Sequence, residues 1–125
     1  MDKEGKLNQL LSQFGTEVVF SREAAKDFNS HSQRSKQIIL EMIVKQAKKG
    51  ARLAPEGLGV RLRAPLHTFG RIKRTSVNLR IIYRPTELED GRLQMVIIAI
   101  GPRERDEVYK AAEKRLASFL KQYKK

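Results

Sequence analysis

Basic side chains dominate residues 51–84, where eight lysines and arginines face one carboxylate and give a local net charge of +7. The basic residues are Arg52, Arg61, Arg63, Arg71, Lys73, Arg74, Arg80 and Arg84, and the carboxylate is Glu56. A guanidinium group can pair with two phosphate oxygens, and a lysine among other cations gives up its proton more readily than usual. Side chains of this kind suit the binding of a phosphodiester and its cleavage by a neighbouring hydroxyl group.

Other common chemistries find little support in the residue types. The chain has no cysteine, which excludes disulfides, cysteine zinc sites and thiol nucleophiles. His31 and His67 have no second histidine or carboxylate at metal-ligand spacing, so neither a metal nor a cofactor is expected. Glu87, Glu89 and Asp90 fall in an expected hairpin loop, where acidic residues are usually solvated turn formers.

The whole chain carries a formal net charge of +12, from 26 lysines and arginines against 14 acidic residues. Such an excess indicates a polyanionic partner, of which nucleic acid is the commonest, although an acidic protein would fit the same total. The longest apolar run, Met95–Ile100, is far shorter than the roughly 20 residues that cross a bilayer. We therefore expect a cytoplasmic protein with no membrane partner.

The first half of the chain predicts helices around one strand. Leucines at helical spacing predict a peripheral N-terminal helical extension over residues 1–15 of a single domain that spans 1–125. Residues 16–20 are β-branched and aromatic, which is typical of a strand. Ser21 is an N-cap candidate for one helix, and residues 29–32 supply a turn and the cap of a second helix, which continues to Lys49.

In the second half of the chain, apolar residues recur with a period of two. Residues 69–75, 79–84 and 93–101 predict three consecutive strands, a short strand is expected near 60–62, and 106–123 predict a last helix. The order of elements predicts an α+β fold: a small antiparallel β-meander sheet with the N-terminal helices packed on one face and a C-terminal helix. We expect the other face of this sheet to be left free.

Strand alternation then predicts the face of the sheet on which the basic side chains lie. If Ile72, Leu79 and Ile81 point into the core, the side chains of Arg71, Lys73 and Arg80 must leave the opposite face together. Three cations on two adjacent strands repel one another, which destabilises the fold and indicates an anionic ligand.

Three segments carry a more specific pattern. They are Phe-Gly-Arg-Ile-Lys at 69–73, Asn-Leu-Arg-Ile-Ile-Tyr at 78–83, and Ile-Gly-Pro-Arg-Glu-Arg-Asp-Glu-Val-Tyr at 100–109. In their types and order they resemble the RelE family of ribosome-dependent mRNA endoribonuclease toxins. The resemblance covers about residues 16–118 and implies the RelE/ParE-like fold.

The resemblance implies the toxin component of a type II toxin–antitoxin system. Such an enzyme enters the ribosomal A site, cleaves the mRNA by 2′-hydroxyl attack and so inhibits translation. The implied partners are mRNA, ribosomal RNA and a cognate acidic antitoxin. The alternative on the same fold is a ParE-like toxin that inhibits DNA gyrase by protein binding, but such proteins generally lack this basic cluster with its tyrosine. A plain nucleic-acid-binding module would explain the charge but not the spacing.

The resemblance also implies the active-site positions, which are Arg71, Lys73, Arg80, Arg103 and Tyr109. Lys73 is the candidate general base, Arg71 and Arg80 suit the phosphate, Arg103 the leaving group, and Tyr109 the stacking of a base. Arg71 stands where the family's best-known member has lysine, and Pro102 replaces a basic residue. Further phosphate contacts to ribosomal RNA are expected from Arg61, Arg63, Arg74, Arg84 and Lys121.

Overall fold

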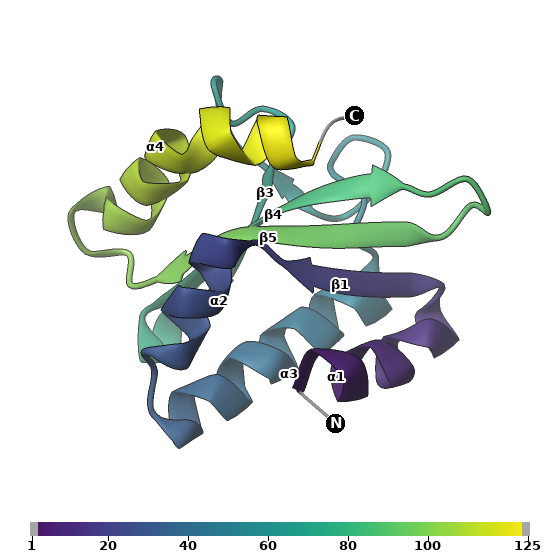
Figure 1. The fold of residues 1–125 in the computed structure, drawn as a ribbon, viewed down its shortest axis with the longest axis horizontal. Helices are drawn as coiled ribbons and strands as arrows, with labels where there is room; N and C mark the ends of the chain where they lie inside the picture. Colours follow the sequence, from purple (N-terminus) through teal and green to yellow (C-terminus); the bar gives the residue numbers. More distant parts are fainter. Residues whose placement is uncertain (1–2, 124–125) are drawn as a thin grey trace.

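A computed structural model describes residues 3–123 as four helices and a five-stranded sheet (Figure 1). The helices are α1 (Lys3–Leu11), α2 (Arg22–Asn29), α3 (Gln33–Lys49) and α4 (Glu107–Gln122). The strands are β1 (Thr16–Phe20), β2 (Val60–Arg61), β3 (Gly70–Arg74), β4 (Leu79–Glu87) and β5 (Leu93–Gly101). Short 3₁₀ turns lie at Ser12–Phe14, Thr75–Val77 and Glu104–Asp106. No helix within residues 3–123 combines the length and apolarity needed to cross a membrane.

The sheet has the strand order β1-β5-β4-β3-β2. The antiparallel meander of β3, β4 and β5 is present as predicted, and β2 adds a short antiparallel edge strand. β1 pairs with β5 in parallel, with Val18 opposite Met95. Strand β4 is longer than predicted and includes Pro85. Its pairing with β3 reaches only to Tyr83, so one edge of β4 has no strand neighbour at Pro85, and a proline is tolerated there.

Two helix starts follow from the local sequence. The Ser21 hydroxyl accepts a hydrogen bond from the Ala24 amide at 3.2 Å, and the Ser32 hydroxyl accepts one from the Ser35 amide at 3.1 Å. Each bond satisfies one amide that the first turn of an α-helix leaves without a partner. The predicted starts of α2 and α3 are therefore confirmed.

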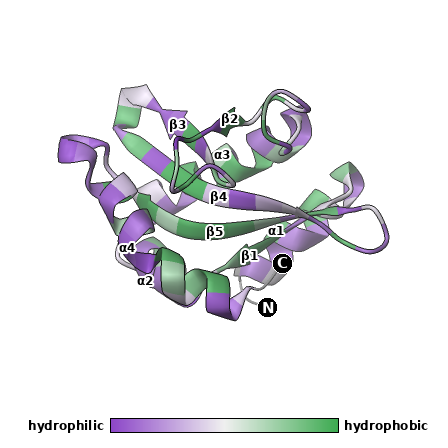
Figure 2. Ribbon diagram, turned by 90° about the horizontal axis from the view of Figure 1, so that it is seen from above, coloured by the Kyte–Doolittle hydropathy of each residue, from purple (hydrophilic) through white to green (hydrophobic). Residues whose placement is uncertain are grey.

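The sheet separates two apolar cores. Helices α1, α2 and α3 pack on one face with Ile72, Ile81 and Ile97, whereas α4 packs on the other with Phe69, Ile82 and further buried residues. Figure 1 shows α4 above the sheet and α1 and α3 below it, and Figure 2 shows that β5 between them is hydrophobic along most of its length. The prediction of a free second face is therefore wrong, because α4 covers part of it.

Helix α1 belongs to the fold more closely than a peripheral extension would. Leu7 and Leu11 are buried in the core beside α3. The Asn8 side chain bonds both the Val18 amide, at 2.6 Å, and the Val18 carbonyl, at 3.0 Å. Glu4 accepts a hydrogen bond from the Phe20 amide at 2.9 Å. The helix thus covers the free edge of β1, which would otherwise offer unpaired backbone groups to another chain.

Candidate functional site

The register of the meander sets three basic residues on one face of the sheet. Lys73 on β3 lies opposite Arg80 on β4, and Arg80 lies opposite Gly101 on β5. Arg71 is two residues before Lys73 and so shares its face. A Cβ atom added to Gly101 would lie 3.8 Å from the Val108 side chain, which shows that this face is the one covered by α4. We call Arg71, Lys73 and Arg80 the basic cluster.

Arg80 is the most enclosed member of the basic cluster, with only 5% of its surface exposed. Its Nη1 atom donates to the neighbouring Leu79 carbonyl at 3.0 Å, but its Nε atom is buried without a hydrogen-bond partner. The Nε atoms of Arg71 and Arg84 are also buried and unpartnered. Among the ion pairs of residues 3–123, none involves a member of the basic cluster.

An unpaired buried guanidinium group costs the fold free energy, because the water it loses is not replaced by a carboxylate. Native proteins rarely keep such groups without a reason, and a missing ligand is one common reason. Lys73 is exposed beside the buried Arg80, so an anion can approach the Lys73 side chain from solvent. The basic cluster therefore has the composition of a phosphate-binding site.

Arg103 follows β5 in the chain, two residues after the one that lies opposite Arg80. Gly101 stands opposite Arg80, and the chain leaves β5 there through Pro102 to Arg103. The Arg103 amide donates to the Asn78 side-chain oxygen at 3.4 Å, which ties the loop after β5 to the turn between β3 and β4. The Arg103 side chain is exposed. Asn78 itself has a φ of 53°, a left-handed conformation that asparagine tolerates better than most residues.

The loop between Arg103 and α4 is strained. Arg105 and Asp106 have φ values of 53° and 56°, and two consecutive non-glycine residues in this region cost about 1 kcal/mol or more each. The Asp106 side chain makes no capping hydrogen bond that would offset this cost. Strain of this kind gathers at functional sites, and here it lies between Arg103 and Tyr109.

Tyr109 lies in the first turn of α4, half-buried against the core on this face. Its neighbour Val108 is fully packed over Gly101, which fixes the start of the helix above the sheet. The ring is thus held by apolar contacts while part of it faces solvent. A ring in that position can stack on an unpaired base.

The five residues expected to hold ribosomal RNA fall into different environments. Arg61 donates to the Ala54 carbonyl at 2.9 Å and the His67 carbonyl at 2.7 Å, so it braces its own loop. Arg74 pairs with Glu41 at 3.6 Å. Arg63 and Lys121 are exposed, and neither takes part in an ion pair within the described residues.

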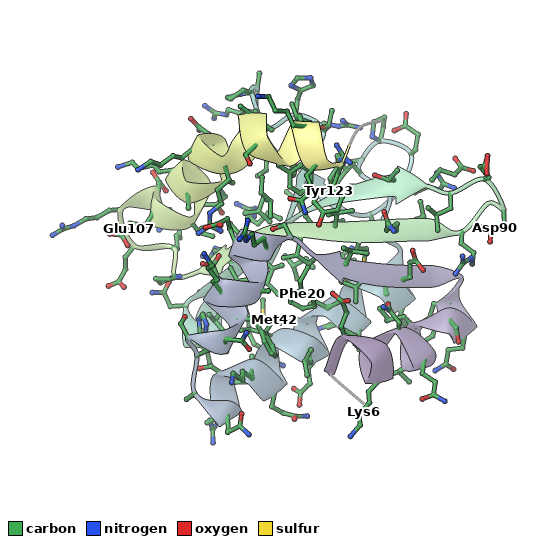
Figure 3. The ribbon with its side chains drawn as sticks, viewed as in Figure 1. Lys6, Phe20, Met42, Asp90, Glu107 and Tyr123 are labelled. Atoms are coloured by element: carbon green, nitrogen blue, oxygen red, sulfur yellow. The ribbon has the colours of Figure 1, made fainter. Side chains whose placement is uncertain are left out.

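Arg84 requires a correction. It is 7% exposed, its Nη2 atom donates to the Tyr123 carbonyl at 2.8 Å, and its guanidinium carbon lies 4.9 Å from the centre of the Phe119 ring. Figure 3 shows Tyr123 at the end of α4 above the sheet. Burial lowers the pKa of this guanidinium group. Arg84 therefore fastens α4 to β4, and a phosphate contact by Arg84 does not fit this arrangement.

Glu41 lines a cavity together with Arg71 and Lys73, and it pairs with Arg74. The acidic residues of the expected hairpin have other partners. Glu87 pairs with Arg52 at 3.5 Å, and Asp90 pairs with Arg92 at 2.8 Å in the exposed β4–β5 hairpin. The hydrogen bond from Arg92 lowers the pKa of Asp90. Figure 3 shows Asp90 at the opposite end of the sheet from Glu107, where α4 begins. Within residues 3–123, no three histidine, aspartate or glutamate side chains are grouped as metal ligands.

Sequence reasoning missed one network beside the site. Arg115 on α4 donates to both oxygens of Asp27 on α2, at 2.7 and 3.1 Å, and to the Ile98 carbonyl at 2.9 Å. Asp27 also accepts from the Ile100 amide at 3.0 Å. Asp27 and Arg115 are 88 positions apart, and no local pattern in the sequence links them. Asn78 was also missed, although asparagine in a short turn is a signal for a left-handed residue.

Comparison with known proteins places the fold. No protein-family model matches the sequence, and no curated protein matches it. A solved structure of an Escherichia coli RelE toxin with two arginines replaced by alanine, in the free state, superposes with a TM-score of 0.58 and 22% identity, over 79% of this chain and 95% of that one. The isolated Escherichia coli RelE toxin gives a TM-score of 0.53 and 22% identity, over 79% and 96%.

A RelBE toxin–antitoxin complex from Mycobacterium tuberculosis is also similar, with a TM-score of 0.52 and 22% identity over 69% of this chain and 95% of that chain. The matched structures are thus covered almost completely, whereas part of this chain has no counterpart in them. The expected α+β fold, with N-terminal helices and a C-terminal helix around the sheet, is confirmed by this similarity. The parallel pairing of β1 with β5 was not part of that prediction. The chain has the fold of the RelE toxins.

Proposed function

We propose that this protein is the toxin of a type II toxin–antitoxin system and cleaves mRNA in the ribosomal A site. The observation that carries the proposal is the buried, unpaired Arg80 beside an exposed Lys73, on a sheet with the RelE fold. Among the ion pairs of residues 3–123, no carboxylate compensates that charge. A phosphate bound at the basic cluster would supply the missing hydrogen-bond acceptors.

The proposed reaction uses the RNA's own 2′-hydroxyl group. Lys73 takes the proton of that hydroxyl as the general base, and the resulting oxygen attacks the adjacent phosphorus. The bond from phosphorus to the 5′-oxygen breaks, leaving a 2′,3′-cyclic phosphate and a 5′-oxyanion, which takes a proton from water to become the 5′-hydroxyl. Arg71 and Arg80 stabilise the negative charge that grows on the non-bridging oxygens.

Arg103 and Tyr109 complete the proposed site. Arg103 lies in the loop that follows Gly101, the residue opposite Arg80. It would stabilise the charge on the departing oxygen rather than protonate it, because arginine hardly loses a proton. Tyr109 would hold an unpaired base of the mRNA by stacking. The set contains neither a histidine nor a carboxylate, so it is a weak group of general catalysts. We therefore infer that the ribosome must position the mRNA for cleavage.

The proposed function also implies a location in the cell and a protein inhibitor. Ribosomes and mRNA would bring the protein to the cytoplasm, with Arg63 and Lys121 as contacts to ribosomal RNA. An acidic antitoxin is the expected inhibitor, since a surface with this excess of positive charge attracts an acidic protein as well as RNA. The Mycobacterium tuberculosis structure is a toxin–antitoxin complex of the same fold, which supports this part.

The decisive experiment is primer extension on a defined mRNA in a reconstituted translation system, with and without ribosomes. Cleavage within the A-site codon only when ribosomes are present is the expected result. Intact mRNA in both reactions, from protein that still arrests growth, would overturn the proposal. A DNA supercoiling assay with purified gyrase would then test the ParE-like alternative.

A further inference from the structure

Helices α1 and α3 lie side by side on the face of the sheet opposite the basic cluster (Figure 1). We propose that the groove between them binds an acidic amphipathic helix of a partner protein. The groove has a volume of about 660 Å³, and its apolar lining includes Leu10, Leu40 and Val44. The proposal does not depend on the chemistry of the basic cluster, because that site faces α4 on the other side of the sheet.

The apolar lining is exposed in an unusual way. Leu10 is 45% exposed, although its neighbours Leu7 and Leu11 are buried in the core. Leu40 and Val44 are half-buried on the facing side of α3, one helical turn apart. Three apolar side chains from two helices thus line the groove. Their exposure to water is unfavourable, so a partner that covers them would gain free energy.

The groove is held open before any partner arrives. Leu7 and Leu11 fix α1 from the inside, and the hydrogen bonds of Asn8 and Glu4 fasten it along the edge of β1. A helix anchored at four positions along its length keeps Leu10 in place. A partner would therefore lose little free energy in ordering this surface.

The charges around the groove select the partner. Lys6, Lys45 and Lys48 line it, and none of them takes part in an ion pair within residues 3–123. Figure 3 shows Lys6 directed away from the sheet. The one carboxylate of the lining, Glu41, is paired with Arg74 at 3.6 Å. An apolar stripe flanked by glutamates or aspartates would satisfy both the leucines and the free lysines.

The test is a titration of the ¹⁵N-labelled full-length protein, followed by NMR at about 0.15 M salt. The probe is a synthetic helix of about 18 residues with leucines on one face and glutamates on the others. A control peptide has the same composition in an order that scatters the leucines. Saturable shifts at the amides of Leu10, Leu40 and Val44 are expected with the probe and not with the control peptide.

Matched variants separate the groove from general attraction between charges. We expect Leu10→Gln to weaken probe binding by about tenfold or more, and Leu120→Gln, which changes an equally exposed leucine on α4, to leave it unchanged. Lys45→Glu combined with Lys48→Glu is expected to weaken binding, whereas Lys110→Glu combined with Lys114→Glu on α4 is not. Amide spectra of the free variants show whether each is folded.

Three outcomes would overturn the proposal. The first is equal binding of the probe to the parent and to Leu10→Gln. The second is a set of shifts confined to the basic cluster and the start of α4. The third is a concentration-dependent dimer that Leu10→Gln dissolves, which would make a second copy of this chain the occupant. None of these outcomes depends on whether the protein cleaves mRNA.

Discussion

Arg115 and Arg80 both reach the central strands of the sheet, but their surroundings differ. Arg115 meets a carboxylate through two hydrogen bonds and a backbone carbonyl through a third, with 23% of its side chain exposed. Arg80 is 5% exposed and donates only to the carbonyl of its own neighbour, Leu79. The difference separates an arginine that is paired with a carboxylate from one that is buried without such a pair.

The end of β1 explains why Arg115 and Asp27 are needed. Pairing of β1 with β5 stops at Phe20 and Ile97, and the Ser21 amide donates to the Ile97 carbonyl at 3.0 Å. Beyond that point β5 has no strand on this side. Arg115 bonds the Ile98 carbonyl and Asp27 bonds the Ile100 amide, so the pair takes the place of the missing strand. Arg80, by contrast, donates only to the carbonyl of its neighbour Leu79.

The largest effect is expected when the unpartnered arginine is removed. Arg80→Ala should lower ribosome-dependent mRNA cleavage by about 10³-fold, because charge on the transferred phosphate loses its main donor. Its free energy of unfolding in urea should match or exceed that of the parent, since an unpaired buried charge is gone. Arg92→Ala removes an exposed arginine paired with Asp90 and serves as the control. Full cleavage by Arg80→Ala would remove Arg80 from the site.

The opposite pattern is expected for the partnered arginine. Arg115→Ala leaves Asp27 partly buried without its partner and should lower the free energy of unfolding by about 3 kcal/mol in urea. The double variant Asp27→Ala with Arg115→Ala should lose clearly less than the sum of the two single losses. Additive losses would mean that Asp27 and Arg115 do not act as a pair.

A smaller loss of stability is expected at Arg84. Arg84→Ala removes the hydrogen bond to Tyr123 and the contact with the Phe119 ring, which together contribute about 1–2 kcal/mol. Hydrogen exchange should accelerate in the last turns of α4, and Lys121→Ala, an exposed change on the same helix, should leave it unchanged. Unchanged exchange with weaker ribosome binding would instead restore Arg84 as a phosphate contact.

The smallest effect is expected at Tyr109. Tyr109→Ala should lower cleavage by about tenfold, because stacking on one base contributes roughly 1–3 kcal/mol. Tyr109→Phe keeps the ring and should retain nearly full activity. An equally large loss in Tyr109→Phe would show that the hydroxyl group, rather than the ring, is what the reaction uses.

Local patterns in the sequence were enough to predict most of the helices and strands and the face on which the basic cluster lies. Serine caps start α2 and α3, and alternation along β3 and β4 puts Arg71, Lys73 and Arg80 opposite the buried Ile72 and Ile81. Both features depend on residues only a few positions apart, because caps and strand alternation are local properties of the backbone.

Local patterns could not predict which of the basic side chains lack a partner, because that depends on how the elements pack. The predicted phosphate contacts included Arg84, which lies beneath α4, and Arg74, which meets Glu41. The parallel pairing of β1 with β5 and the irregular register of β5 near Ile98 were equally beyond local rules. An arginine has the same intrinsic propensity for helix or strand whether its side chain contacts a carboxylate, an aromatic ring or solvent. Its partner is set by the packing of elements far apart in the chain, and that packing leaves Arg80 unpaired and Arg115 satisfied.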